Sequence, residues 1–563
     1  MIRMLTFAVT LILLCAVGAV QADTEFETRA TQMLSSIFHD DAPGAAVVVS
    51  RNGEVIYSRA FGMANIGLDV PVATDHVFRL ASVTKQYAAA GLLALIEDGE
   101  VALDDPLSKF LPDFPIGEVT IEQLLNHTSG IKSYTGIPGY MMSERIRADL
   151  STNQLVAVFA DEAADFAPGE AFAYNNSGYV LVGAVIEAVT GQPWNDFIRE
   201  RLLLPLGIEQ TDAYADNAVV PGRVQGYAGP VNAPVRARYL SMTQPHAAGA
   251  LMATAADVDR WSHALHTGRV IGDELYQAMI TPTGAAIEAL GGQGYGYGLI
   301  VGDWYGQPAY HHGGGIFGFS THTLWLPDEQ LSVVVLTNSA GGGWSRDDVS
   351  LRLAGLATGR TYSVDLEPVD MDADALAQFV GTYRIDEDTV RTLRLEHGQL
   401  ISQRQGSQDF TVYAVQGDRL AFENSLASYA VERDAGGAVV AVALQDGWGA
   451  EPERAIKISN EIQVRETVQV AEAELQRLVG DYELQPGMVL TVSVNDGQLQ
   501  VQATGQGPLI MQAESSTRFF NTQIGAEIEF DATDDGPASS LTLFQGGVEM
   551  PAPRVTADAV VEG

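Results

Sequence analysis

A repeat with a period of 99 residues marks the C-terminal part of this chain of 563 residues. "FVGTYRI" from Phe379 matches "LVGDYEL" from Leu478, which pairs Gly381 with Gly480, and two further pairs keep the same offset of 99: Gly398 with Gly497, and Arg419 with Arg518. A constant offset predicts two copies of one unit, and short apolar runs between turn residues are typical of antiparallel strands. We therefore expect two small all-β, barrel-like domains, over residues 375–460 and 470–556.

The residues before the repeat mix helical and strand patterns. "AAVVVSRNGEVIYSR" predicts a hairpin, because Asn52-Gly53 supplies the positive φ angles of a tight turn. "SVTKQYAAAGLLALIEDGE" predicts a helix with one apolar stripe that ends at Gly99. "THTLWLP" and "LSVVVLTN" predict strands of a sheet that helices cover. We expect an α+β domain over residues 23–360, joined to the repeat by a linker at residues 361–374.

Residues 1–22 have the pattern of a signal peptide. Arg3 gives a positive start, the stretch from Leu5 to Val20 is apolar, and "VQA" before Asp23 fits a small-residue cleavage site. We expect an exported protein, periplasmic or secreted, and no later segment is long and apolar enough to span a membrane. Cys15 is the only cysteine, so the mature protein would hold no disulfide and no thiol nucleophile.

The net charge of the chain limits the classes of molecule that it is expected to bind. Lys and Arg number 32 against 71 Asp and Glu, a formal net charge of −39. Such a surface repels nucleic acids and anionic membranes, which leaves a small-molecule or peptide substrate as the expected partner. The sequence contains no H-E-x-x-H motif and no lysine after a glycine-rich loop, so we expect neither a metal nor a cofactor.

Ser-x-x-Lys occurs twice, and its surroundings distinguish the two copies. Ser82 and Lys85 open the predicted helix, where residues three apart share one face and allow direct proton transfer. Free N–H groups at that helix end favour a developing oxyanion. Ser129-Gly130 follows the helical stretch "TIEQLLNH", and the glycine that ends this helix predicts a turn at Ser129 and Lys132. A serine needs a base to become a nucleophile, and burial can lower the pKa of a lysine enough for that task. We therefore favour Ser82 as the nucleophile.

Tyr174 and Asn176 lie in "FAYNNSGY", a loop just before a helix that is predicted to start near Ser177 and end at Gly191. A tyrosine near a buried lysine is able to share proton transfer, and a loop at a helix N-terminus can aim both side chains into a cleft. A packed tyrosine and a capping asparagine are the structural alternative for this segment taken alone.

The stretch "YHHGGGIFGF", residues 310–319, is predicted to be a strand. Neighbours on a strand point to opposite faces, so His311 and His312 cannot bind one metal ion together. No G-x-S-x-G is present, which excludes the nucleophile turn of an α/β-hydrolase. The glycines let a substrate lie against bare backbone. We expect two other histidines, His263 and His266, to lie on an exposed helix face.

Taken together, Ser82-x-x-Lys85, Tyr174-x-Asn176 and His312-Gly313-Gly314 resemble, in order and separation, the motifs of the serine β-lactamase and penicillin-binding protein superfamily. Within it, they are similar to the branch of class C β-lactamases, D-aminopeptidases, D-Ala-D-Ala carboxypeptidases and related esterases. "FRLASVTKQ", "LLNHTSGI" and "YNNSGY" agree, and the resemblance covers about residues 30–355. It implies a β-lactamase/transpeptidase-like domain, an antiparallel sheet with helices. The duplicated part resembles the paired barrels that follow the catalytic domain in D-aminopeptidase-like members.

The resemblance also implies roles for single residues. Ser82 would be the acylated nucleophile and Lys85 its proton acceptor. Tyr174 would relay a proton to the leaving group and assist deacylation by water. Asn176 would hydrogen-bond the substrate. The oxyanion hole would consist of the backbone N–H groups of Ser82 and Gly315.

His312 departs from the pattern of β-lactamases, and with Gly314 it is expected to line the substrate site. The lactamases and carboxypeptidases usually carry a lysine there, whose fixed charge attracts a carboxylate, whereas histidine is mostly neutral at pH 7. We therefore expect a serine hydrolase with peptidase-like or esterase-like activity and weak or no β-lactam hydrolysis. The alternatives are a peptidoglycan or β-lactam sensor with little catalysis, a true class C β-lactamase, and a partner-binding protein whose barrels are the functional part.

Overall fold

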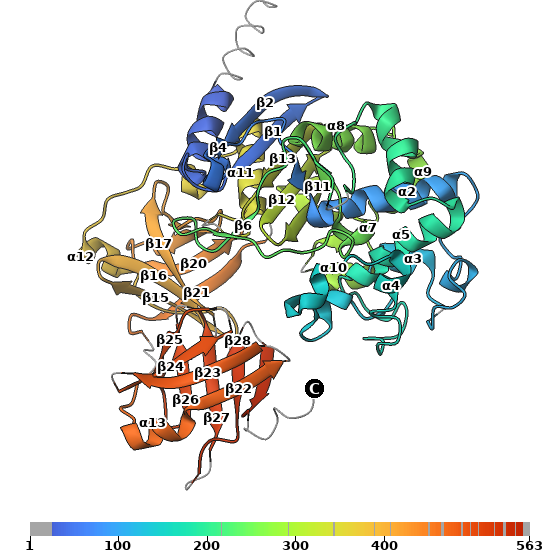
Figure 1. Ribbon diagram of the computed structural model, residues 1–563. Helices are drawn as coiled ribbons and strands as arrows, with labels where there is room; N and C mark the ends of the chain where they lie inside the picture. The colour runs from blue at the N-terminus through green and yellow to red at the C-terminus, as the bar shows by residue number, and fades with distance from the viewer. Residues whose placement is uncertain are drawn as a thin grey trace, which may run out of the picture. The chain divides into compact units, whose positions relative to one another are not determined.

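The computed structural model describes residues 25–555, apart from gaps at 117, 215–216, 291, 342–343, 388, 406, 449–450, 463–466, 486–487, 496, 505, 523, 533–535 and 546–547. The predicted signal peptide therefore lies outside the described residues. Two compact units divide near Tyr362, and Figure 1 shows each of them. Among the described residues, no helix combines the length and the apolar character that a membrane crossing requires.

A seven-stranded antiparallel sheet forms the centre of the N-terminal unit (Figure 1). Its strand order is β2-β1-β13-β12-β11-β10-β9, with β1 at Ala45–Arg51, β2 at Glu54–Phe61, β9 at Gly294–Tyr295, β10 at Ile300–Trp304, β11 at Gln307–Ile316, β12 at Phe319–Leu326 and β13 at Leu331–Thr337. The predicted hairpin is β1–β2, and its turn has positive φ at both Asn52 (54°) and Gly53 (80°). Every residue of β13 is buried, because helices cover both faces of the sheet.

Two neighbouring residues on β1 identify the helices on these faces. Ser50 donates a hydrogen bond to Asp259 Oδ1 (2.5 Å) in α8, Ala255–His266, whereas Arg51 donates to Ala357 O (2.6 Å) in α11, Arg346–Thr358. Adjacent side chains on a strand point to opposite faces, so α8 and α11 lie on opposite sides of the sheet.

The prediction that His263 and His266 lie on an exposed helix face is wrong. Both rings pack on Trp325 of β12, His263 edge-on at 4.9 Å and His266 stacked at 5.2 Å between ring centroids. Their spacing of three residues on α8 turns both toward the sheet, so this histidine face is covered.

A cluster of helices, α2 (Thr84–Glu97), α5 (Asn176–Thr190) and α7 (His246–Gly249), packs together beside the sheet (Figure 1). The helix predicted after Ser82 is α2, and Gly99 follows its end with a φ of +79°. The single apolar stripe expected for α2 is wrong, because every residue from Thr84 to Leu95 is buried, Lys85 included. Small residues let neighbouring helices approach α2 from all sides, which places the lysine in an apolar environment.

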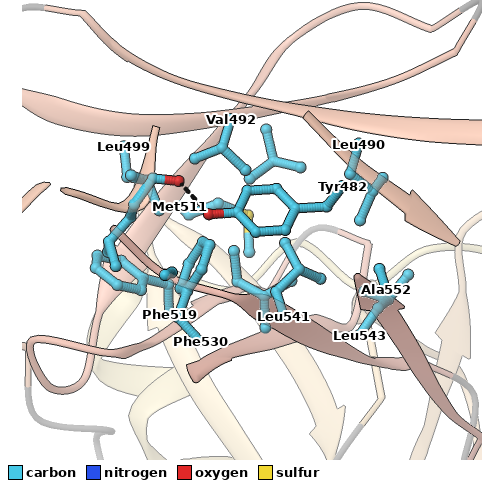
Figure 2. Packing of buried hydrophobic residues seen from close by; sticks show 14 of the residues in the cluster. Tyr482, Leu490, Val492, Leu499, Met511, Phe519, Phe530, Leu541, Leu543 and Ala552 are labelled. Atoms are coloured by element: carbon cyan, nitrogen blue, oxygen red, sulfur yellow. Dashed lines mark hydrogen bonds between the residues drawn. The ribbon is translucent and has the colours of Figure 1, made fainter. Parts of the chain in front are cut away.

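The C-terminal unit contains two antiparallel eight-stranded sheets with the same element order. The first is a closed barrel of β14–β21, from Gly381 to Ser459, and the second is formed by β22–β29, from Gly480 to Pro553. The repeat extends to single hydrogen bonds, because Tyr383 donates to Phe379 O (2.6 Å) as Tyr482 donates to Leu478 O (2.7 Å). Figure 2 shows Tyr482 in the apolar core of the second sheet.

Candidate active site

Ser82 lies in the 3₁₀ turn Ala81–Val83, directly before α2. This is the helix-start position that the sequence predicts. The preceding residue, Ala81, has a φ of +49°, a left-handed conformation that costs a non-glycine residue free energy and is common at functional sites. A hydrogen bond from β12 fixes the chain at the start of this turn, because the Thr321 hydroxyl donates to Leu80 O (2.8 Å).

Lys85 follows one helical turn later, and its ammonium group is enclosed. Its Nζ donates to Ser82 Oγ (3.3 Å), to Asn176 Oδ1 (2.8 Å) and to the carbonyl oxygen of Ala248 (2.9 Å). The side chain is fully buried, and all three acceptors are neutral. Burial therefore lowers the pKa of Lys85 well below its ordinary value, which makes its amine better suited to accept a proton than that of an exposed lysine.

The loop before α5 positions Asn176 against this lysine. Asn175 is the helix cap, since its Oδ1 accepts a hydrogen bond from Gly178 N (2.9 Å). Asn176 is the first helical residue, so its side chain is free of the capping role and faces Lys85. The Asn176 amide nitrogen also donates to Thr135 Oγ1 (3.0 Å). The capping alternative thus holds for Asn175 and not for Asn176.

Tyr174 lies over the same lysine, with Lys85 Nζ 4.7 Å from the centre of its ring. The residue is 41% exposed. The protein nevertheless keeps water away from the phenol group, and this desolvation raises the pKa of Tyr174. A hydrogen bond with Ser82 and the positive charge of Arg346 act in the opposite direction, but their effect is smaller. The tyrosine therefore remains a protonated phenol, able to donate, while Lys85 is the group suited to accept a proton.

His312 lies on β11 with its ring 6.0 Å from that of Tyr174. Its Nδ1 is 2.6 Å from Gly313 O and its Nε2 is 3.0 Å from the Tyr295 hydroxyl. A carbonyl oxygen only accepts, so Nδ1 carries the proton and Nε2 accepts from Tyr295. Burial lowers the pKa of His312 to about 3. The histidine is thus neutral, with both ring nitrogens already engaged.

The glycines after His312 differ in what surrounds them. A Cβ at Gly314 would lie 2.2 Å from Leu80 O and 2.3 Å from Thr321 Oγ1, whereas a Cβ at Gly315 would meet nothing within 4 Å. Gly314 therefore lets β11 touch the turn that carries Ser82, and Gly315 presents bare backbone to open space. The pairing of β10 with β11 stops at His311, so the β11 edge beyond it has no strand partner among the described residues.

The second Ser-x-x-Lys pair does not form a comparable arrangement. Lys132 Nζ pairs with Asp165 Oδ1 at 2.8 Å, and both side chains are partly exposed. Ser129 Oγ accepts a hydrogen bond from Ile131 N (3.4 Å), and Gly130 has a φ of +70°. This is the turn that the sequence predicts, and its lysine is directed to Asp165 and not to Ser129.

Two further residues support the site and were missed in the sequence. His127 accepts a hydrogen bond from Asn175 N (3.1 Å) and packs its ring 4.5 Å from those of both Tyr174 and Tyr295. Tyr295 in turn occupies Nε2 of His312. His127 lies in the quoted stretch "LLNHTSGI", but the contacts of both residues could not be read from the sequence, because they join segments far apart in the chain. Among the described residues, no group of three or more His, Cys, Asp or Glu is placed to hold a metal ion.

Comparisons with known proteins agree on the N-terminal unit. A beta-lactamase family model matches residues 26–357, and a model described as a domain of unknown function (DUF3471) matches residues 464–557. Penicillin-binding protein 4* of Bacillus subtilis (strain 168) is 26% identical over 385 residues, 63% of this chain and 82% of that protein. A D-aminopeptidase of Gluconobacter oxydans (strain 621H) is 26% identical over 364 residues, 63% of this chain and 65% of that protein. The crystal structure of a D-stereospecific amidohydrolase from Streptomyces sp. has a TM-score of 0.53 and 27% identity, covering 60% of this chain and 99% of that one.

Proposed function

The chain belongs to the beta-lactamase family and is a serine hydrolase, and we propose that it cleaves an amide or ester bond through an acyl-enzyme formed on Ser82. The observation that carries this proposal is the buried Lys85 amine, 3.3 Å from Ser82 Oγ and bonded otherwise to neutral oxygens. An amine whose pKa is lowered by burial can serve as the base that a serine nucleophile needs.

In the acylation step, Ser82 Oγ attacks the substrate carbonyl carbon while its proton passes to Lys85 Nζ. The charge that develops on the carbonyl oxygen is stabilised by the N–H groups of Ser82 and Gly315. Asn176 holds the lysine through its Oδ1 and hydrogen-bonds the substrate with the remaining capacity of its amide.

The leaving group then needs a proton as its bond to the carbonyl carbon breaks. Tyr174 is placed to relay that proton from Lys85, because its phenol is protonated and lies against both Lys85 and Ser82. In deacylation a water molecule attacks the acyl carbon, gives up a proton along the same path, and Ser82 is restored.

The proposed substrate is an amide or ester of a small acyl compound, with D-aminoacyl amides as the first class to test. Relatives named D-aminopeptidase and D-stereospecific amidohydrolase support this choice. Weak or no β-lactam hydrolysis is proposed because the neutral His312, bonded to Tyr295 and to Gly313 O, adds no positive charge for a β-lactam carboxylate.

We propose export as well, on the composition of residues 1–22. The measurement is N-terminal sequencing of protein recovered from the periplasm or the medium of the expressing cells. A mature chain that starts at Asp23 supports export, and an intact Met1 on protein retained in the cytoplasm contradicts it.

A fluorophosphonate probe tests the nucleophile directly. The wild-type protein is expected to be labelled on Ser82, and Ser82→Ala to lose both the label and hydrolysis. Ser129→Ala is the matched control, since it removes the serine of the other Ser-x-x-Lys pair and is expected to keep both. Labelling of Ser82→Ala at the wild-type rate would remove Ser82 from the site.

Turnover distinguishes the proposed enzyme from a sensor and from a β-lactamase. D-aminoacyl anilides, short-chain p-nitrophenyl esters and a chromogenic cephalosporin are compared on the same preparation. Steady release from an anilide or ester supports the hydrolase. A fluorescent-penicillin adduct that forms and never turns over, with no hydrolysis of any substrate, indicates the sensor. Preference for the cephalosporin indicates a class C-type β-lactamase.

A further inference from the structure

His246 is a buried residue with a left-handed backbone conformation. Among the described residues other than glycine, a positive φ occurs together with a buried side chain at Ala81 (49°), His127 (62°) and His246 (47°). Ala81 directly precedes Ser82, and His127 packs on Tyr174, so the first two belong to the candidate active site. Backbone strain of this kind is concentrated at functional sites, and the contacts of His246 connect it to the same site.

His246 is the first residue of α7, the short helix that supplies a hydrogen-bond acceptor to Lys85. The acceptor is the carbonyl oxygen of Ala248, 2.9 Å from Lys85 Nζ. A helix this short does not hold its shape alone, so contacts with the rest of the fold must position the Ala248 carbonyl. After the C-terminal end of α7, the carbonyl oxygen of Leu251 accepts a hydrogen bond from Leu80 N (2.8 Å). At the N-terminal end, the contacts are those of the His246 side chain.

The His246 ring joins α7 to helices α4 and α5. Its Nε2 lies 3.1 Å from the Thr152 hydroxyl oxygen in α4 (Thr152–Val156) and 3.8 Å from Glu187 Oε1 in α5. Its Nδ1 has no hydrogen-bond partner among the described residues, so the ring proton lies on Nε2, which donates toward these two oxygens. The ring rests on Gly183 of α5, where an added Cβ would lie 2.8 Å from Nδ1.

Glu187 is itself fixed in the position that receives this ring. Its Oε1 also accepts a hydrogen bond from Trp194 N (3.3 Å). Burial opposes the ionisation of Glu187, but hydrogen bonds from His246 and Thr152 outweigh this effect and hold the pKa of Glu187 below its ordinary value. An ionised, anchored carboxylate therefore holds the first residue of α7.

The position of the Ala248 carbonyl is important because of the shape of a neutral amine. Neutral Lys85 has two N–H groups and one lone pair. Asn176 Oδ1 (2.8 Å) and Ala248 O (2.9 Å) are the acceptors for the two N–H groups. The lone pair is then left to face the Ser82 hydroxyl, whose oxygen is 3.3 Å from Nζ. An amine without the Ala248 acceptor is free to rotate, and its lone pair loses this direction.

We propose that His246 is a positioning residue: held by Thr152 and Glu187, it fixes α7 so that the Ala248 carbonyl directs the Lys85 lone pair at Ser82. His246 acts only through Ala248 and Lys85. Because this role concerns the base of the acylation step, it rests on the proposed function.

Two variants of His246 separate its hydrogen bonds from its backbone conformation. His246→Gln keeps an N–H at about the reach of Nε2, and its rate of fluorophosphonate labelling at Ser82 should stay within about threefold of the wild-type rate. His246→Asn accommodates a positive φ, but its amide is too short to reach Thr152. It should be labelled about 10- to 100-fold more slowly, as a group misplaced by about 1 Å in a site causes.

The pH dependence of labelling is a readout that a general loss of stability does not move. With Ala248 O displaced, protonated Lys85 loses one of its three acceptors and binds its proton less tightly. The midpoint of the labelling rate against pH should therefore move down by about one pH unit in His246→Asn and keep its wild-type value in His246→Gln. The other titratable groups that face Lys85 among the described residues are unchanged in both variants: His127, Tyr174, Tyr179 and His312.

Thr152→Val is a milder variant that leaves residue 246 intact. It removes the hydroxyl 3.1 Å from Nε2, and it should slow labelling by at least about threefold and move the midpoint in the same direction. His266→Gln is the matched control, because His266 also bonds a hydroxyl, that of Tyr276 (2.8 Å), but belongs to α8. It should keep the wild-type rate and midpoint.

Circular dichroism identifies the variants that are folded. Folded His246→Asn or Thr152→Val protein with the wild-type rate and midpoint would overturn the positioning role, whatever its thermal stability, and would leave the proposed function standing. If His246→Asn does not fold, Thr152→Val decides between the two results. Wild-type protein with neither labelling at Ser82 nor hydrolysis would overturn the proposed function instead.

Discussion

In the proposed mechanism, the protonation state of Lys85 decides whether Ser82 can lose its proton. Its burial among neutral hydrogen-bond acceptors lowers the pKa of Lys85, so the folded protein holds the amine neutral over a range in which the unfolded chain binds a proton. In that range, between the lowered pKa and about 10.4, unfolding takes up a proton and stability rises with pH. The charge state that suits catalysis therefore lowers stability at neutral pH.

The first prediction concerns the base itself. Lys85→Arg places at this position a guanidinium that cannot lose its proton near neutral pH, so hydrolysis should fall by about 10³-fold, the usual contribution of a general base. In the wild type, kcat/KM should rise with pH as Lys85 loses its proton, with a midpoint well below 10.4. The measurement is a pH–rate profile with a p-nitrophenyl ester.

Lys132→Arg is the control for this change, because Lys132 is a partly exposed lysine paired with Asp165. It should keep the wild-type profile. A Lys85→Arg variant that retains the wild-type rate and profile would show that another group accepts the serine proton.

The second prediction tests the proposed role of Tyr174 in proton transfer independently of that of Lys85. Tyr174→Phe keeps the ring that lies 4.7 Å from Lys85 Nζ but removes the proton donor. Anilide hydrolysis, which needs a protonated leaving group, should fall by about 10²–10³-fold. The acylation step with p-nitrophenyl esters, measured as the pre-steady-state release of p-nitrophenolate, should fall far less, because p-nitrophenolate leaves without a proton. Equal losses on both substrates would contradict a relay to the leaving group.

At the scale of elements, the site depends on the contact between β11 and the turn before α2. The contact needs a residue without a side chain at Gly314, where the Leu80 carbonyl oxygen occupies the place of a Cβ. Thr321 of β12 donates a hydrogen bond to the same carbonyl oxygen. Strands β11 and β12 therefore both contact the Leu80 carbonyl group, directly before the turn that carries Ser82. The run of three glycines thus contains positions with unlike physical constraints.

The third prediction uses this difference. Gly314→Ala should lower the free energy of unfolding by about 2–3 kcal/mol, since its methyl group meets backbone that cannot move aside, and hydrolysis should fall with it. Gly315→Ala adds the same methyl group to open space and should leave stability within about 0.5 kcal/mol of wild type. Denaturant unfolding of the two variants measures this, and equal stabilities would contradict the close contact.

At the scale of the whole molecule, the hydrolase and the barrels are separable in relatives. The Streptomyces amidohydrolase aligns over 99% of its own length with only 60% of this chain, and the beta-lactamase match ends at residue 357. The candidate residues from Ser82 to Gly315 all lie within that match.

The fourth prediction follows from this separation. A chain truncated after Asp365 should still be labelled by fluorophosphonate on Ser82 and should hydrolyse a short p-nitrophenyl ester within about tenfold of the full-length rate. A soluble, folded truncated chain without any hydrolysis would favour the alternative in which the barrels are essential to function. Circular dichroism on the same sample verifies that it is folded.

Much of this architecture was predictable from local pattern. The β1–β2 turn and the position of Ser82 before a helix depend on propensities that operate over a few residues, and the two barrel-like sheets were indicated by the 99-residue repeat. The sequence alone also distinguished the surroundings of Ser82 from those of Ser129, because a helix start and a turn at a glycine have different local sequence patterns. The burial of α2 and of the histidines on α8 was mispredicted, because periodicity describes one helix and not the number of neighbours around it.

The amino-acid sequence therefore identifies the candidate groups and the elements that carry them. The chemical state of these groups depends on the fold. Lys85 has a lowered pKa because three helices exclude water from it, and His312 is neutral and occupied because Tyr295, distant in sequence, bonds its Nε2. The solvation and the long-range hydrogen bonds of a side chain depend on all the segments that surround it in the fold. A sequence motif can therefore identify a lysine or a histidine but cannot predict its charge.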